Sequence, residues 1–85
     1  MINLRNQKAI VTGASKGIGR SIAFQLAEYG CDLFLLSRSQ NALDEVRDAI
    51  LTQFNTKVES YATDISKHES VNKTFTNIIS KTNRI

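Results

Sequence analysis

The segment TGASKGIG at residues 12–19 places three glycines, Gly13, Gly17 and Gly19, between a short apolar run and a stretch with helical periodicity. Glycine at such a turn lets the backbone bend sharply and approach a bound group closely. Free amides at the start of a helix, together with the positive end of the helix dipole, attract negative charge. The spacing therefore predicts a loop that holds a phosphate or pyrophosphate group.

Two other structures compete with a phosphate loop as interpretations of this glycine segment. The plainer one is a tight turn between a strand and a helix with no ligand, although three glycines, a buried strand and a helix coincide here. The other is the GxxxxGK[ST] loop of nucleoside triphosphatases, which, counted from Gly13, needs glycine at Ile18 and lysine at Gly19. The spacing excludes this second loop, and the tight turn stays open.

Polar residues follow the two later apolar runs as well. Ser37 and Arg38 come after the second run, and Asp64 and Ile65 come after the third. The guanidinium of Arg38 is a planar fork of donors suited to a phosphate, and Lys16 adds a second cation from the glycine loop. The alternatives are that both cations are solvated surface residues and that Asp64 serves only in a turn.

Strands and helices must alternate to place these residues. Strands are expected at residues 8–12, 31–36 and 57–63, the last one less apolar and towards a sheet edge. Helices are expected to open at Gly17, with Gly30 as the C-terminal cap, to follow a stripe from Leu43 to Phe54, and to open at Ser66, with Glu69 completing a capping box. This βαβαβα order predicts an α/β fold with parallel strands and helices packed on the sheet.

Each expected helix has an apolar stripe that predicts its buried face. The stripes are Ile18, Ile22, Ala23, Leu26 and Ala27 in the first, Leu43, Val46, Ile50 and Phe54 in the second, and Val71, Phe75, Ile78 and Ile79 in the third.

The TGxxxGxG spacing resembles the short-chain dehydrogenase/reductase family, and the likeness covers the whole chain. The resemblance implies that the three glycines form a phosphate loop and that the adenosine ribose and adenine lie against the ends of the second and third strands. It assigns the Asp64 side chain to the adenine amino group and the Ile65 main chain to the ring. The implied cofactor-binding residues are Gly13, Ser15, Lys16, Gly17, Ile18, Gly19, Ser37, Arg38, Asp64 and Ile65.

The residues at the end of the second strand predict which nicotinamide cofactor binds. A carboxylate there binds the ribose hydroxyls of NAD and repels the extra phosphate of NADP. Ser37 and Arg38 occupy that end, and the family that the chain resembles uses basic residues at the positions of Arg38 and Lys16 to recognise NADP. The expected cofactor is therefore NADP(H).

Catalytic residues of the family are not found at their spacing. The family uses a tyrosine with a lysine four residues later, but Leu33 stands four beyond Tyr29 and Ile65 stands four beyond Tyr61. The last residues, 84–85, resemble those that lead into a fourth strand. Residues 1–85 are therefore expected to be the N-terminal part of a single NADP(H)-binding Rossmann domain of three layers, with strands in the order 3-2-1 and without the catalytic half.

The resemblance implies an NADP-dependent oxidoreductase, most similar to the 3-oxoacyl-[acyl-carrier-protein] reductases, that transfers hydride to a ketone of a small-molecule substrate. The 85 residues alone are expected to be inactive. The alternatives are a non-catalytic half-domain that binds a nucleotide or a partner, and an inert remnant. Self-association is expected through the exposed edge of the first strand.

Composition excludes other classes of function. The chain has 41% hydrophobic and 22% charged residues, as one small soluble domain does. Its net charge of +3 is not gathered in a basic stripe, so no nucleic-acid partner is expected, and no apolar run approaches a membrane span. The lone Cys31 favours a small core residue and a cytoplasmic setting, and His68 has no partner at metal spacing, so no metal site is expected.

Overall fold

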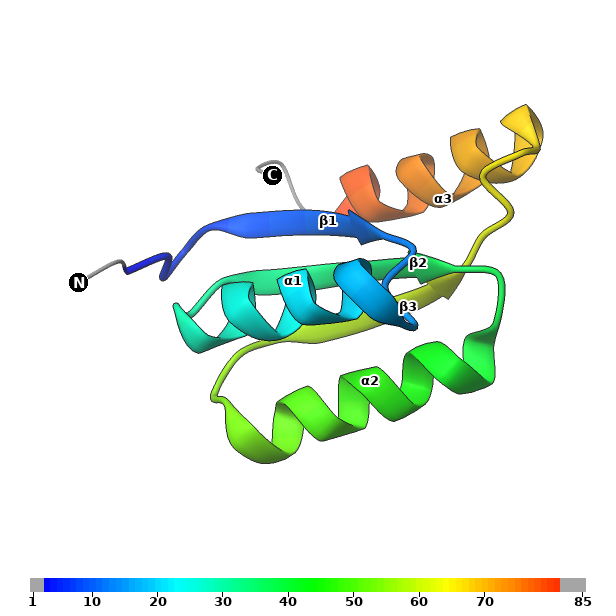
Figure 1. Ribbon diagram of the computed structural model, residues 1–85. Helices are drawn as coiled ribbons and strands as arrows, with labels where there is room; N and C mark the ends of the chain where they lie inside the picture. The colour runs from blue at the N-terminus through cyan, green and yellow to red at the C-terminus, as the bar shows by residue number, and fades with distance from the viewer. Residues whose placement is uncertain (1–2, 82–85) are drawn as a thin grey trace.

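Strands and helices alternate along residues 3–81, the part of the chain that the computed structural model describes (Figure 1). The strands pair in parallel in the order β1-β2-β3, so the predicted α/β fold with a 3-2-1 sheet is confirmed. The elements are β1 (Lys8–Thr12), α1 (Gly17–Glu28), β2 (Asp32–Ser37), α2 (Gln40–Gln53), β3 (Val58–Ala62) and α3 (His68–Lys81).

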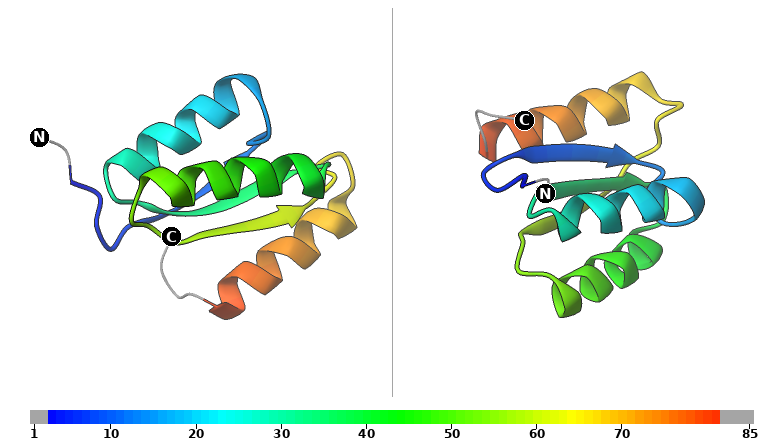
Figure 2. Two further views of the ribbon diagram at one scale, coloured as in Figure 1. Left: turned by 90° about the horizontal axis from the view of Figure 1, so that it is seen from below. Right: turned by 60° about the vertical axis from the view of Figure 1, so that its left-hand side comes forward.

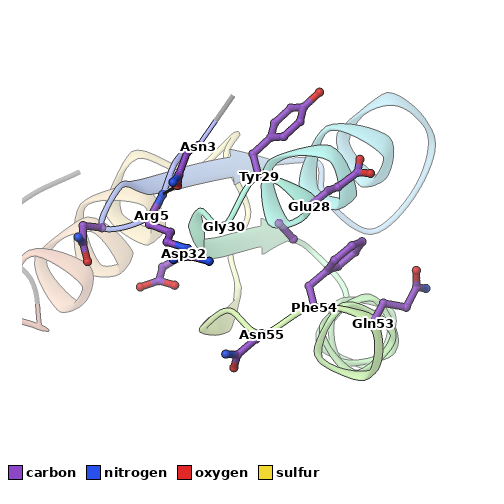
Figure 3. Close-up of a pocket in the computed structure, with 11 residues that line it drawn as sticks. Asn3, Arg5, Glu28, Tyr29, Gly30, Asp32, Gln53, Phe54 and Asn55 are labelled. Carbon is purple, nitrogen blue, oxygen red and sulfur yellow. Dashed lines mark hydrogen bonds between the residues drawn. The ribbon is translucent and has the colours of Figure 1, made fainter. Parts of the chain in front are cut away.

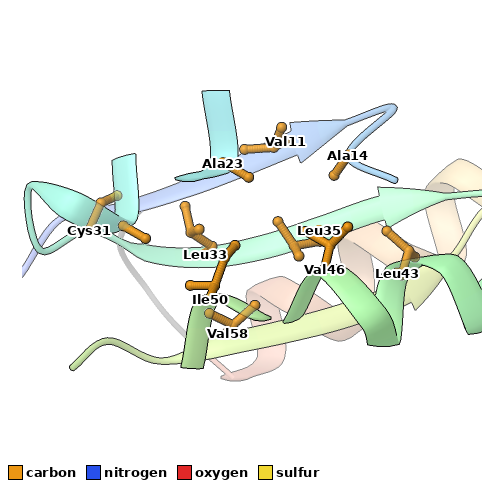
Figure 4. Close-up of a cluster of buried hydrophobic side chains, with 11 residues drawn as sticks. Val11, Ala14, Ala23, Cys31, Leu33, Leu35, Leu43, Val46, Ile50 and Val58 are labelled. Carbon is orange, nitrogen blue, oxygen red and sulfur yellow. The ribbon is translucent and has the colours of Figure 1, made fainter. Parts of the chain in front are cut away.

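The helices form two layers, one on each side of the sheet. Helices α1 and α2 cover one face, and α3 lies against the other (Figures 1 and 2). The larger core cluster lies between the sheet and the first two helices, where Leu33 and Leu35 meet Leu43, Val46 and Ile50 (Figure 4). The predicted three-layer arrangement follows from these two separate cores.

The central strand β2 is buried on both faces. Its side chains alternate, so that Leu33 and Leu35 enter the larger cluster while Phe34 and Leu36 pack with Ile78 of α3. A strand covered by helices on both sides needs apolar residues at consecutive positions, which is why its sequence shows no polar alternation. Parallel pairing with β1 and β3 then brings the three carboxyl ends of the strands to one edge of the sheet.

Some predicted helix faces are wrong. Ile18 is 80% exposed, Ile22 43% and Ile79 63%, although all three were placed in buried stripes. In α1 the contact with the sheet is made by Ala23 and Ala27, whose small side chains bring the helix close and leave a narrow buried arc. An adjacent helical residue is turned by about 100°, so Ile79 faces solvent when its neighbour Ile78 is buried.

The predicted capping box at the third helix is also wrong. Helix α3 begins at His68, and Ser66 lies in the turn before it. Both the Ser66 amide and the Ser66 hydroxyl donate to the Asp64 carboxylate, the hydroxyl at 2.6 Å, so Ser66 closes a turn with Asp64 instead of capping the helix. By contrast, Gly30 has the left-handed φ of +95° expected after α1, and Cys31 is 2% exposed, as a small core residue should be.

None of the helices within residues 3–81 is long and apolar enough to cross a lipid bilayer. Across the same residues, β1 pairs only with β2, so its other edge is open. Residues 84–85, which resemble an approach to a fourth strand, lie outside the described residues.

Replacing Leu35 by alanine should lower the free energy of unfolding by about 2–5 kcal/mol, because the side chain is fully buried in the larger cluster and its loss leaves a cavity. Urea unfolding followed by circular dichroism measures the change. The control is Ile79→Ala at an exposed position, for which a change of no more than about 0.5 kcal/mol is expected. Equal losses in the two variants would contradict the core described above.

Candidate functional site

The loop between β1 and α1 has a backbone that only glycine tolerates well. Gly13 and Gly17 have left-handed φ angles of +61° and +60°, which side chains with a Cβ rarely adopt. At Gly19 the limit is space, because a Cβ there would collide with the carbonyl of Gly13. The start of α1 therefore lies directly against the end of β1, and all three predicted glycines are required by the local geometry.

The first turn of α1 is open to an anion. Lys16 is the N-cap, in an extended conformation, and makes no side-chain capping bond, and the first turn contains no acidic residue. Helix α2 starts differently, because Ser39 Oγ accepts a hydrogen bond from the Ala42 amide at 3.3 Å. The unpaired amides and the positive end of the α1 dipole therefore face outward at the glycine loop, where a phosphate would satisfy them.

Hydrogen bonds tie the three strand ends together. The Ala14 amide donates to the Leu36 carbonyl at 3.1 Å, and the Thr63 amide donates to the Ser37 carbonyl at 2.7 Å. The Ser37 hydroxyl donates in turn to Ser15 Oγ at 3.0 Å. The glycine loop and the ends of β2 and β3 are therefore held as one unit.

A cavity of about 340 Å³ opens between these strand ends. Six of its lining residues belong to the predicted set, whereas Ser39 and Thr63 do not. A signal existed for both, because Ser39 is a typical N-cap residue before the second helical stripe and Thr63 ends the third expected strand. The lining residues are Gly13, Ser15, Lys16, Ser37, Arg38, Ser39, Thr63 and Ile65.

Four predicted residues do not line the cavity. Gly17 and Gly19 shape the loop behind it, and Ile18 extends into solvent with 80% of its surface exposed. The Asp64 carboxylate accepts hydrogen bonds from the amide of Ser66 at 3.0 Å and from its hydroxyl. The turn interpretation of Asp64 accounts for these bonds, and its contact with adenine stays a prediction.

Charge at the cavity is positive and comes from two loops. Lys16 belongs to the glycine loop and Arg38 to the end of β2, and within residues 3–81 neither takes part in an ion pair. The Ser66 hydroxyl, followed by the Ser66 amide, lowers the pKa of Asp64, with smaller contributions from the charges of Arg38 and Lys67. Asp64 is thus a nearby counter-charge that is already engaged in its own turn.

A larger hollow, of about 730 Å³, lies at the opposite end of the sheet (Figure 3). The segments that precede β1, β2 and β3 form it, with Arg5, Glu28 and Asn55 among its lining residues. None of the predicted site residues is there. It has neither a glycine loop nor the start of a described helix, so the smaller cavity at the carboxyl ends is the candidate site.

Comparison with known protein families identifies the family of this chain. The family described as short chain dehydrogenase matches residues 7–85, which include the glycine loop and the ends of β2 and β3. The chain belongs to this family. The TGxxxGxG resemblance seen in the sequence is confirmed.

Individual members of the family agree with this assignment. A very-long-chain 3-oxoacyl-CoA reductase of Vanderwaltozyma polyspora is 43% identical over 63 residues, which are 74% of this chain and 18% of that protein. A metagenomic short-chain oxidoreductase in complex with NADP has a TM-score of 0.90 at 33% identity and is matched over 95% of this chain and 36% of that one. For a Haemophilus influenza oxidoreductase with bound NAD the TM-score is 0.85 at 28% identity, over 94% and 28% of the two chains. The chain thus spans well under half the length of each.

Replacing Gly19 by alanine should weaken nucleotide binding at least tenfold and destabilise the fold by about 1–3 kcal/mol, because the new Cβ collides with a backbone carbonyl that cannot rotate away. Fluorescence titration with NADPH and urea unfolding measure the two effects. Ser21→Ala, at an exposed position of the same helix, is the control and should change neither. Unchanged affinity in Gly19→Ala would contradict the described contact with Gly13.

The pKa of Asp64 should lie below its ordinary value, and Ser66→Ala should raise it by removing the hydroxyl donor. Because the folded-state pKa is the lower one, the carboxylate stabilises the fold above its unfolded-state pKa. That stability is lost as the pH falls through the folded-state pKa. Carbon-13 NMR titration of the carboxyl group measures the shift. Ser70→Ala is the matched control, since Ser70 Oγ accepts from the Asp64 amide and not from the carboxylate.

Proposed function

We propose that this chain is the NADP(H)-binding part of a short-chain reductase that transfers hydride to the ketone of a 3-oxoacyl-type substrate. One observation carries the proposal. The start of α1 has neither a capping side chain nor an acidic residue, and it faces a glycine loop beside a cavity lined by Lys16 and Arg38, which form no ion pair with the other residues that the structure describes. A ligand with several phosphates supplies the acceptors and the negative charge that this arrangement lacks.

The residues present fit a dinucleotide. The absence of a Cβ at Gly19 keeps the loop tight against Gly13, so that a pyrophosphate can approach the amides that begin α1. Ser15 and Ser37 would hold the adenosine ribose, and Ile65 lies on the cavity wall where the adenine ring would stack. When bound, the nicotinamide supplies the hydride, and the residues of this chain bind and orient the cofactor.

The choice of NADP over NAD rests on the end of β2 and not on the fold. Similar folds carry NADP in one solved relative and NAD in another, so the local charge must decide. No carboxylate lines the cavity within residues 3–81, and Arg38 and Lys16 do. A guanidinium and an ammonium favour the extra phosphate of NADP, which a carboxylate at this place would repel.

The substrate class is supported by likeness and not by a site in this chain. The Vanderwaltozyma relative is named a very-long-chain 3-oxoacyl-CoA reductase, and the glycine loop and Ser37-Arg38 also resemble 3-oxoacyl-[acyl-carrier-protein] reductases. Both names share a 3-oxoacyl thioester, so that is the class we propose. The cytoplasmic setting expected from the lone Cys31 stays a prediction.

Exchanging Arg38 for aspartate should reverse the preference for NADPH over NADH, because the new carboxylate repels the extra phosphate and accepts bonds from the ribose hydroxyls. Fluorescence titrations with the two nucleotides give the ratio of their dissociation constants, which we expect to shift at least tenfold. Arg5→Asp makes the same change of charge at the hollow on the other end of the sheet and should leave the ratio as it is. A ratio unaffected by Arg38→Asp, or wild-type chain that binds NADH as well as NADPH, would refute the proposed cofactor.

A further inference from the structure

A polar network joins the start of α2 to β3, the strand against which this helix packs (Figure 1). The Gln40 amide nitrogen donates to Asp44 Oδ1 at 2.8 Å and to Ser60 Oγ at 2.9 Å. Ser60 Oγ donates to the same Asp44 oxygen at 2.8 Å. The Gln40 amide oxygen accepts from the Ala62 backbone amide at 3.1 Å. Both amide hydrogens and the oxygen of Gln40 therefore have partners.

These neighbours permit one orientation of the Gln40 amide. If the amide were reversed, its NH₂ group would meet the backbone donor of Ala62, and its oxygen would meet the Asp44 carboxylate. Hydrogen bonds, first from Gln40 and then from Ser60, lower the pKa of Asp44. The carboxylate is therefore ionised at neutral pH and remains an acceptor, so the side chain of Gln40 is held between α2 and β3.

The network fixes one end of the segment that contains Arg38. Residues 37–40 connect the end of β2 to the start of α2, and Arg38 lines the cavity within this segment. At the β2 end, the Ser37 carbonyl accepts from the Thr63 amide at 2.7 Å, and Ser37 Oγ accepts from the Ser39 amide at 3.3 Å. At the α2 end, the anchor is the side chain of Gln40. The backbone of Arg38 is therefore held from both sides.

A fixed backbone matters for a guanidinium that binds a phosphate. The paired hydrogen bonds between the two groups need a defined geometry. If residues 37–40 could move, the phosphate would have to order them on binding, and the affinity would fall by that cost. A nucleotide without a phosphate at this place makes no use of the Arg38 guanidinium and avoids most of the cost.

We propose that Gln40 is a positioning residue for the extra phosphate of NADP, acting through the backbone of Arg38 and not by contact with the nucleotide. Asp44, Ser60 and the Ala62 amide hold Gln40 in the position that this role requires. The inference rests on the proposed NADP(H) site and adds a determinant of its selectivity outside the lining of the cavity.

Two nucleotides that differ by one phosphate test this role. Adenosine 2′,5′-bisphosphate has the extra phosphate of NADP, and adenosine 5′-monophosphate lacks it. Isothermal titration calorimetry gives the ratio of their dissociation constants. Gln40→Ala should lower the preference for the bisphosphate about fivefold, mainly by weakening the binding of that nucleotide. The matched control is Gln53→Ala, the same change at an exposed glutamine at the other end of α2, and it should leave the ratio unchanged.

Ser60 separates positioning from direct contact, because it contacts Gln40 and does not line the cavity. Ser60→Ala should lower the preference about twofold, and Ser60→Thr, which keeps a hydroxyl, should leave it near the wild-type value. Adding Ser60→Ala to Gln40→Ala should have no further effect, since the network is already broken. A loss of stability alone would weaken both nucleotides together and would not change the ratio.

Nitrogen-15 relaxation without any nucleotide tests the segment itself. In the wild-type chain the amides of Arg38 and Ser39 should have order parameters of about 0.85, as rigid backbone does. The values should fall in Gln40→Ala and stay the same in Gln53→Ala.

Two results would overturn the role of Gln40. One is a set of order parameters at Arg38 and Ser39 that does not change in Gln40→Ala, and the other is a preference for the bisphosphate that this variant retains in full. A wild-type chain without that preference would instead refute the proposed cofactor. The relaxation measurement uses no nucleotide, so it would still decide whether Gln40 orders the segment.

Discussion

Burial of β2 on both faces is the constraint on which the rest of the structure depends. Leu35 faces one layer of helices and Phe34 faces the other, so a helix must cover each side of the sheet. Helices α1 and α2 each cross over between parallel neighbours and cover one face, and α3 follows β3 onto the other face. Parallel neighbours then end at one edge, and the glycine loop, the end of β2 and the end of β3 meet there because the core requires it.

At that shared edge the first two helices begin in different ways. Ser39 caps α2, whereas α1 begins at Gly17 with no capping side chain and no acid in its first turn. An uncapped start leaves amides unsatisfied, which costs stability unless water or a ligand accepts their hydrogen bonds. The amides at the start of α2 are therefore partly satisfied within the protein, whereas those at the start of α1 remain available to bind a ligand. The residue types in the two loops make this difference.

The sequence predicts the positions of strands and helices better than it predicts which face of a helix is buried. The strand at residues 8–12 is correct because a continuous apolar run that ends at Gly13 has few other interpretations. The stripes that included Ile18 and Ile79 are wrong because periodicity counts apolar residues without knowing how wide an arc the sheet covers. The capping box at Ser66 is wrong because Ser66 closes a turn with Asp64 and the helix begins two residues later, at His68. The cavity residues that follow a strand end were largely predictable, because a parallel sheet fixes where they gather.

The position of a charge matters more at this site than the overall charge of the chain. An acid is present beside the cavity, but Asp64 follows β3 and its carboxylate is held by Ser66, while the end of β2 has Arg38. At the end of β3, the Asp64 carboxylate acts as a partial counter-charge to the Arg38 guanidinium. It does not occupy the end of β2, where the ribose hydroxyls of NAD would bind. Under the proposed function, the preference for NADP follows from which of two neighbouring strands carries the acid. A net charge of +3, spread over the surface, would not distinguish these two arrangements.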